Sequence, residues 1–182
     1  MTPVFAALAT PRLTLAPIGA HDIDDVWRML VQAEVRRFLC DDKILPRAFV
    51  AGLVDEDIAL ASDGLGLRIV RDKAGFCGFA GIKPVSAEIA ACIPAFRDNV
   101  EISIALDPSR WGRGYAREAL AAVMAEYDAQ ATGRRLVAVA DVPNLRSRTL
   151  LERLGFVLSG EHAGPLYRLA GYRRAADRIA TS

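Results

Sequence analysis

The stretch from Val100 to Leu120, VEISIALDPSRWGRGYAREAL, contains the features that decide the fold of this chain. Its first seven residues, 100–106, alternate and are rich in β-branched apolar side chains, which predicts a β-strand. The following Asp-Pro-Ser segment ends the strand, because proline has no amide hydrogen and a fixed φ. Gly112 and Gly114 then allow dihedral angles that are closed to other residues. A helix is expected to begin directly after them.

The helix after the glycines is amphipathic. Its apolar residues recur at helical spacing on one face: Ala116, Leu120, Val123, Met124 and Tyr127. Unpaired amides at a helix N-terminus and the positive end of the helix dipole attract anions. Arg110, Arg113 and Arg117 add positive charge around this point. The strand, loop and helix together predict a site for a diphosphate.

Two classes of nucleotide-binding protein place a glycine loop between a strand and a helix in a similar way. A P-loop NTPase requires GxxxxGK followed by Ser or Thr, and the absence of these residues excludes that class. A Rossmann site requires GxGxxG, and Arg117 occupies the place of its third glycine. Asp141, at the end of the next predicted strand, could take the part of the ribose-binding acid. A dinucleotide-binding protein therefore remains an alternative.

Composition predicts one soluble domain of 182 residues, with 52% hydrophobic and 25% charged residues. We expect a core over about residues 11–170 and a frayed tail after about residue 172. The net charge of +1 predicts no nucleic-acid or membrane partner, and no apolar run is long enough to span a membrane. Cys40, Cys77 and Cys92 match no metal-ligand spacing and are expected to be reduced thiols of a cytoplasmic protein.

The rest of the chain predicts alternating strands and helices. Residues 1–10 look like a loose lead-in, and strands are expected at 12–18, 65–71, 76–83, 134–140, 157–159 and 166–169. Helices are expected in two pieces between 22 and 39, at 46–62, and at 144–154, the last with Leu145, Thr149, Leu150 and Leu154 inward. The connection 83–99 predicts a short helix or a flap, whose Ile89, Ile93 and Phe96 cover the core or a dimer contact. These elements indicate an α/β fold with a mixed, mostly antiparallel sheet of six or seven strands flanked by helices.

The loop resembles the acyl-CoA loop of the GNAT acetyltransferases, whose pattern is Gln or Arg, two residues, Gly, any residue, then Gly or Ala. Gly114 and Ala116 match it, and Trp111 replaces the leading Gln or Arg. WGRGYAREAL is similar to the branch that includes the ribosomal-protein N-terminal acetyltransferases of the RimJ and RimL type. After the next strand come Asn144, Ser147 and a helix ending in Leu-Gly-Phe, in the order found in the family. The match is sharp between about residues 101 and 156.

This resemblance implies an N-acetyltransferase that moves acetyl from acetyl-CoA to a primary amine by direct attack, without a metal. It also implies a V-shaped splay between two central parallel strands. Glu101 would be the general base and Ser147 a hydrogen-bond donor to the leaving thiolate, because Leu151 replaces the tyrosine common in the family. The residues expected to bind the acetyl-CoA are Ile104, Ala105, Leu106, Trp111, Gly112, Arg113, Gly114, Tyr115, Ala116, Arg117 and Asn144.

Simpler roles remain open for several of these residues. Glu101 could be an exposed strand carboxylate, Ser147 a surface serine, and the two loop arginines solvated charges. His21 and His162 are interpreted as surface residues, and a covalent mechanism through a cysteine is disfavoured. A second hypothesis for the whole chain is an acyl-CoA-binding module without transfer activity. The resemblance leaves the acceptor open between a protein N-terminus and a small amine, and the chain is expected to be a monomer or a homodimer.

Overall fold

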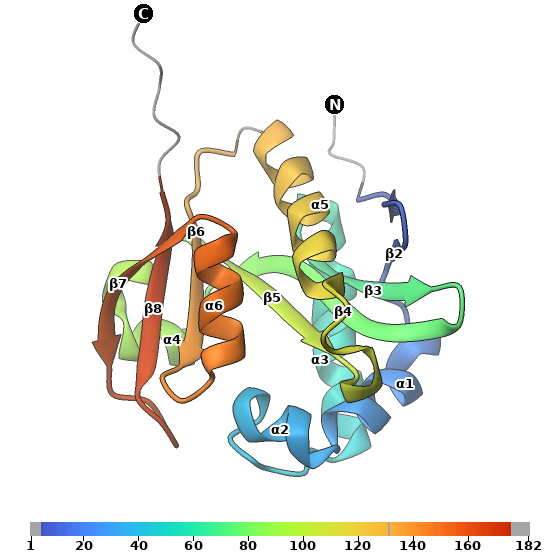
Figure 1. Ribbon diagram of the computed structural model, residues 1–182, viewed down its shortest axis with the longest axis horizontal. Helices are drawn as coiled ribbons and strands as arrows, with labels where there is room; N and C mark the ends of the chain where they lie inside the picture. The colour runs from blue at the N-terminus through green and yellow to red at the C-terminus, as the bar shows by residue number, and fades with distance from the viewer. Residues whose placement is uncertain (1–4, 131, 176–182) are drawn as a thin grey trace, which may run out of the picture. The chain divides into compact units, whose positions relative to one another are not determined.

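The computed structural model describes residues 5–130 and 132–175 (Figure 1). The chain forms two compact units. The first unit contains Met1–Pro84 and Glu101–Gly133, and the second contains Val85–Val100 and Arg134–Ser182. Each unit is built from two separate segments of the chain, so the polypeptide passes from one unit to the other three times.

The sheet of the first unit has the strand order β1-β2-β3-β4-β5. Its strands are β1 (Leu8–Ala9), β2 (Thr14–Pro17), β3 (Gly66–Asp72), β4 (Gly75–Pro84) and β5 (Val100–Leu106). The pairs β1–β2, β2–β3 and β3–β4 are antiparallel, and the register Asp72↔Gly75 confirms the predicted hairpin. β5 has the predicted bounds. The lead-in differs from the prediction, because Leu8 and Ala9 pair with β2.

Four helices accompany this sheet: α1 (Ile23–Leu30), α2 (Ala33–Leu39), α3 (Arg47–Leu60) and α5 (Tyr115–Ala129). α5 lies on one face of the sheet and α3 on the other, with α1 beside α3 (Figure 1). Val26 of α1, Val54 of α3 and Ile69 of β3 belong to one buried cluster. The predicted apolar face of α5 is confirmed for Leu120, Val123, Met124 and Tyr127, which are buried. At the start of the helix the prediction is wrong, since Ala119 is buried and Ala116 is only half-buried.

A buried arginine lies in β3, on the side opposite the cluster around Ile69. The Arg68 side chain is 1% exposed, its Nε donates to the Ala6 carbonyl at 2.9 Å, and its guanidinium pairs with Glu126 of α5 at 2.6 Å. It also lies over the Phe5 ring, 3.7 Å from the ring centroid. Because a buried guanidinium must be paired, this residue ties the N-terminal segment and α5 to the sheet.

The second unit contains β6 (Leu136–Asp141), β7 (Phe156–His162) and β8 (Leu169–Arg174), in the order β6-β8-β7 with antiparallel pairs. The segment 83–99 was expected to form a short helix or a flap, and it contains a short helix, α4 (Ala87–Cys92). Ile93 and Phe96 pack with Val137, which confirms that they cover a core.

The last strand and the last helix correct two predictions. β8 begins at Leu169 rather than ending there, and Tyr172 is fully buried. In α6 (Leu145–Arg153) the predicted inner face is wrong, since Leu145 is 67% exposed and Leu151 is the buried residue. Arg148 also points inward: its Nε donates to the Tyr172 hydroxyl at 3.0 Å and its Nη1 donates to the Val142 carbonyl at 3.1 Å. A polar inner residue of this kind is invisible to a hydrophobic pattern.

The α/β class with mostly antiparallel pairing is confirmed, and the described residues contain eight strands rather than six or seven. The expected splay concerns β5 and β6, which lie in different units apart from Val100, so it stays a prediction. The tail expected to fray after about residue 172 begins later than predicted, because Arg173 and Arg174 belong to β8, and residues 176–182 lie outside the described residues. Among the residues described, no helix combines the length and apolarity that crossing a membrane requires.

Candidate active site

The loop between β5 and α5 has the conformation that its glycines predict. Gly112 has φ +74° and Gly114 has φ +78°, both in the left-handed region that favours glycine. A Cβ built on Gly112 would meet no atom within 4 Å, and one on Gly114 would meet only an Arg12 nitrogen at 3.5 Å. Open space therefore lies over the backbone of the loop, at the point where α5 begins with Gly114 as its N-cap.

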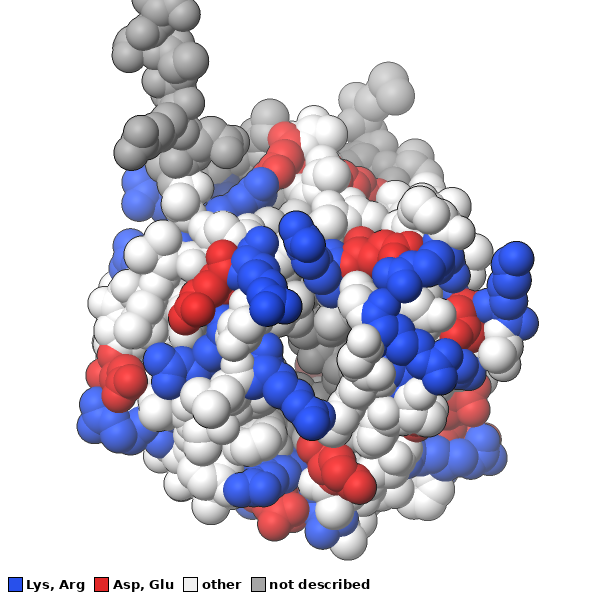
Figure 2. Space-filling view, in the orientation of Figure 1, with Lys and Arg blue, Asp and Glu red and all other residues white. Residues whose placement is uncertain are grey.

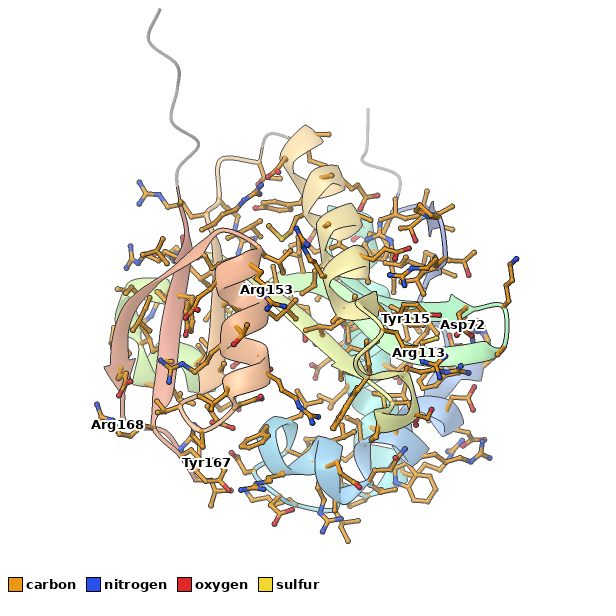
Figure 3. All side chains as sticks on the ribbon, viewed as in Figure 1. Asp72, Arg113, Tyr115, Arg153, Tyr167 and Arg168 are labelled. Carbon is orange, nitrogen blue, oxygen red and sulfur yellow. The ribbon has the colours of Figure 1, made fainter. Side chains whose placement is uncertain are left out.

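Asp72, at the end of β3, holds both ends of the loop. Its carboxylate pairs with Arg110 Nη1 at 3.0 Å and accepts a hydrogen bond from the Tyr115 hydroxyl at 3.3 Å. Figure 3 shows Tyr115 beside Asp72, with Arg113 close by on the loop. Burial tends to raise the pKa of Asp72, but the Ala74 amide, Arg110 and Tyr115 together lower it. The charge of Arg110 is therefore balanced by an ion pair with Asp72.

Arg12, just before β2, is a second anchor that the sequence did not single out. Its Nη1 donates to the Arg113 carbonyl at 2.9 Å, and its Nε donates to Glu118 at 2.7 Å. Its guanidinium also lies 4.9 Å from the centroid of the Tyr115 ring. These contacts join residues about a hundred positions apart, and no local pattern could have indicated them. They fix the loop and the first turn of α5 before any ligand arrives.

Trp111 ties the loop back to the strand that precedes it. Its indole Nε1 donates to the Leu106 carbonyl at 2.7 Å, and the half-buried ring packs against the core of the first unit. The Leu106 carbonyl is therefore already occupied. Of the three strand residues expected to bind the donor, Ala105 and Leu106 are buried and Ile104 is half-buried.

Two arginines at this place remain available to a ligand. Arg113 and Arg117 are exposed, and no ion pair of either side chain is found among residues 5–130 and 132–175. Over the elements of the first unit, basic side chains alternate with acidic ones (Figure 2), so the positive charge here is local. Exposed guanidinium groups beside the amides of a helix N-terminus make a site suited to an anion.

Glu101, the expected base, is a half-buried residue near the start of β5 in the same unit. Alternate residues of a strand project from the same face, so Glu101 and Ser103 share one face of β5. Ser103 lines a cavity of about 180 Å³ that lies within the first unit. The predicted base, the loop and this cavity thus all belong to the first unit.

Asn144 and Ser147, the remaining predicted residues, lie in the second unit. The Asn144 carboxamide oxygen accepts a hydrogen bond from the Ser147 amide at 3.2 Å, so Asn144 is the N-cap of α6. Both residues are half-buried. The structure thus gives Asn144 a capping role that the sequence analysis did not predict.

The cysteines and histidines were the other candidates for covalent or metal chemistry. Burial raises the pKa of the Cys40 thiol, with Asp41 acting in the same direction, and burial also raises the pKa of Cys77. A raised pKa disfavours the reactive thiolate. The His21 side chain is exposed, as expected. Over the part of the chain that is described, no three His, Cys, Asp or Glu residues gather as metal ligands would.

A comparison with protein families supplies the identification. The model of the acetyltransferase (GNAT) domain matches residues 12–157, which is more than half of the chain and takes in parts of both units. The chain belongs to the GNAT acetyltransferase family. It is therefore an acyltransferase enzyme by family, and the dinucleotide-binding alternative is not supported.

Solved structures resemble this GNAT chain over nearly its whole length. A protein described as a GNAT-family acetyltransferase from Bordetella pertussis is 25% identical, with a TM-score of 0.78, covering 93% of this chain and 99% of its own. A Salmonella typhimurium acetyltransferase that modifies the N-terminal serine of a 50S ribosomal subunit protein is 20% identical, with a TM-score of 0.72 and coverage of 97% and 99%. The acetyltransferase yncA of Salmonella typhimurium, solved with acetyl-CoA, is 18% identical, with a TM-score of 0.70 and coverage of 93% and 97%. At 20% and 18% identity, the likeness to the two Salmonella proteins shows the GNAT fold alone.

Proposed function

We propose that this GNAT protein transfers an acetyl group from acetyl-CoA to a primary amine, by direct attack in a ternary complex. The observation that carries the proposal is the anchored loop between β5 and α5, where Arg113 and Arg117 stand exposed beside a helix N-terminus. The solved complex of yncA with acetyl-CoA supports the choice of donor.

The donor diphosphate would bind the loop backbone from Gly112 to Ala116, with the two arginines neutralising its charge. Because the loop is held by Asp72, Arg12 and the Trp111 indole, little ordering would be needed on binding. The pantetheine arm would use backbone groups of Ile104 and Ala105, since the Leu106 carbonyl is already bonded. Asn144 of the second unit is proposed as a further donor contact.

Glu101 is proposed as the general base, acting directly or through water. An acceptor amine is protonated at neutral pH, with a pKa of about 8 for an α-amine and about 10.4 for lysine, and has no lone pair in that form. The base takes one proton from the nitrogen, the nitrogen attacks the thioester carbonyl, and the tetrahedral intermediate expels the CoA thiolate. The second proton that the nitrogen loses goes to this thiolate, directly or through water, which gives the neutral amide and CoA thiol. Ser147 would donate a hydrogen bond to the leaving sulfur, in place of the tyrosine that Leu151 replaces.

We further propose that the two units act as one N-acetyltransferase domain of the RimJ and RimL type, in the cytoplasm. The family match runs through both units, and a ribosomal-protein acetyltransferase is among the structural neighbours. The acceptor would then be a protein N-terminus or a small amine, and residues outside the loop would select it.

The test is an assay of CoA thiol release from acetyl-CoA with a panel of amines that includes N-terminal peptides, beside calorimetric titration of CoA. We expect CoA to bind and at least one amine to be acetylated. CoA binding without turnover on any amine would favour the acyl-CoA-binding module. The absence of CoA binding by the folded protein would overturn the proposal.

A further inference from the structure

Ser103, in the middle of β5, carries a hydroxyl group that the proposed mechanism does not use. The residue is half-buried and lines the cavity of the first unit. Within residues 5–130 and 132–175, its hydroxyl has no hydrogen-bond partner. Its oxygen is also not one of the fully buried side-chain atoms that lack a partner in this part of the chain. The hydroxyl is therefore accessible, and a ligand can supply the hydrogen bond that the protein does not.

The face of β5 that carries Ser103 also carries Glu101, the proposed base. Alternate residues of a strand project to the same side, so Glu101, Ser103 and Ala105 share one face. Ala105 belongs to the buried cluster that contains residues of α1 and α3. This face is therefore turned toward these helices, and the two oxygen-bearing side chains lie on the same side of the sheet.

The neighbouring strand β4 leaves space beside this serine. β4 and β5 are adjacent in the sheet. Near one end of the pair, the Asp107 amide donates to the Cys77 carbonyl at 2.8 Å. Just beyond the other end, the Val85 amide donates to the Asn99 carbonyl at 3.3 Å. Both bonds fit one antiparallel register, which places Gly81 opposite the serine, and glycine has no side chain to cover the hydroxyl.

Glu101 and Ser103 are close enough to hold one nitrogen atom between them. Two residues of a strand span about 7 Å. Hydrogen bonds of about 3 Å from the nitrogen to each side chain, together with the length of the glutamate side chain, cover this distance. An acceptor ammonium has three N–H groups, so it can donate to the carboxylate and to the hydroxyl at the same time.

We propose that Ser103 binds the acceptor: its hydroxyl oxygen accepts a hydrogen bond from the acceptor nitrogen and holds this nitrogen beside Glu101. This inference rests on the proposed acetyl transfer and adds a residue to its acceptor site. A neutral amine still has two N–H groups, so the hydrogen bond to the serine persists after the base has taken one proton. The hydroxyl thus keeps the nitrogen in place while its lone pair attacks the thioester.

Two isosteric substitutions test the hydroxyl. Ser103→Thr keeps it and Ser103→Val replaces it by a methyl group, and both β-branched side chains suit a strand. Steady-state kinetics are measured with acetyl-CoA and each amine of the panel that the wild type acetylates. The kcat/KM for the amine should be about 10- to 10²-fold lower in Ser103→Val than in Ser103→Thr, as expected for one hydrogen bond from a charged group. The KM for acetyl-CoA and the calorimetric Kd for CoA should be the same in both.

Thr149→Val is the matched control, because it makes the same change from hydroxyl to methyl at an exposed residue of α6. It should leave the kcat/KM for the amine as in the wild type. Equal values of this kcat/KM in Ser103→Thr and Ser103→Val would overturn the inference. A difference of the same size in the affinity for CoA would give the serine a structural role and overturn it as well.

The pH separates holding the nitrogen from passing on its proton. The ratio of kcat/KM between Ser103→Thr and Ser103→Val should be the same at pH 7 and at pH 10, because a neutral amine also donates to the hydroxyl. A ratio that falls to one at pH 10 would make the hydroxyl a proton relay, which contradicts the inference.

The same kinetics distinguish failure of this inference from failure of the proposed function. A wild type that acetylates no amine overturns the proposed transfer and this inference with it. A wild type that acetylates an amine, with Ser103→Thr and Ser103→Val equally active, overturns this inference alone. A loss confined to Ser103→Val, with full activity in Glu101→Gln, supports the serine and removes the proposed base.

Discussion

Glu118, in the first turn of α5, accepts hydrogen bonds from Thr10 at 2.6 Å and from Arg12 at 2.7 Å. Burial tends to raise the pKa of this carboxyl, but these donors outweigh burial and lower the pKa below its ordinary value of 4.5. A carboxyl with a lowered pKa stabilises the folded state fully above its unfolded pKa. That contribution is lost as the pH falls through the folded pKa.

We predict that Glu118→Gln lowers the free energy of unfolding by about 1 kcal/mol at pH 7, the size expected for an exposed network of charge-assisted hydrogen bonds. Urea unfolding from pH 7 down to pH 3 measures it. The difference from the wild type should stay constant above about pH 5 and shrink below it. Glu88→Gln, at an exposed residue of α4, is the control. A difference that does not change with pH would mean that the carboxylate charge is not the cause.

Glu101 gives a second prediction at the scale of one residue. Glu101→Gln removes the proposed base and keeps the shape of the side chain, so kcat should fall by roughly 10²-fold at neutral pH. The loss should be smaller at high pH, where the amine is already neutral. Steady-state kinetics between pH 7 and pH 10 measure it. A loss of constant size would assign Glu101 a positioning role, and full activity would remove it from the mechanism.

At the scale of one element, the loop before α5 depends on glycine at two positions. Gly114→Val adds a β-branched side chain where φ is +78° and where the open space suits a diphosphate. We predict that the folded variant no longer binds CoA in a calorimetric titration. Gly133→Val is the matched control, since Gly133 also has a positive φ, +72°, with no atom within 4 Å of an added Cβ. Unchanged CoA affinity in Gly114→Val would contradict the assignment of the loop.

The elements that the sequence predicted well are those whose signals are local. The bounds of β5, the β3–β4 hairpin and the start of α5 after Gly114 all follow from alternation, turn residues and glycine. The elements predicted badly depend on distant partners. The inner face of α6 includes Arg148, which donates to the Tyr172 hydroxyl, and the position of β8 is set by its pairing with β6 and β7.

In the candidate site, too, the sequence predicted the local features and missed the contacts with distant residues. The left-handed glycines and the exposed Arg113 and Arg117 were indicated by the motif alone. The anchors of the loop were not, because Arg12 and Asp72 lie far from it in sequence and look like ordinary charged residues of strands and turns. The ion pair of Asp57 with Lys83 was missed for a related reason, because nothing in the sequences of α3 and β4 shows that the Asp57 carboxylate is buried.

At the scale of the whole molecule, the proposed catalytic residues are divided between the two units. Ser147→Ala, in the second unit, should lower kcat by roughly 10- to 10²-fold, as expected for one lost hydrogen bond to the leaving thiolate. The KM for acetyl-CoA should change little. Thr149→Ala is the control, because Thr149 is an exposed residue of the same helix. An unchanged kcat in Ser147→Ala would leave the release of the thiolate to water.

The division into units also bears on how the chain unfolds. Both tryptophans, Trp27 and Trp111, lie in the first unit, so tryptophan fluorescence reports on that unit, whereas far-UV circular dichroism reports on both. Each unit consists of two chain segments, and the chain passes between them after Pro84, Val100 and Gly133. Loss of either unit would therefore release loops inside the other. We predict that the two probes give coincident urea transitions, which is the behaviour of a single domain.

Unfolding in the presence of CoA gives a stricter test of whether the two units unfold together. The proposed donor contacts come from the loop of the first unit and from Asn144 of the second, so CoA should stabilise both units together. At a free CoA concentration 100 times its Kd, the free energy of unfolding should rise by about 2.7 kcal/mol with both probes. A fluorescence transition that moves alone would limit the CoA site to the first unit and remove Asn144 from it. If the dichroism and fluorescence transitions already differ in the absence of CoA, the chain contains two domains instead of one.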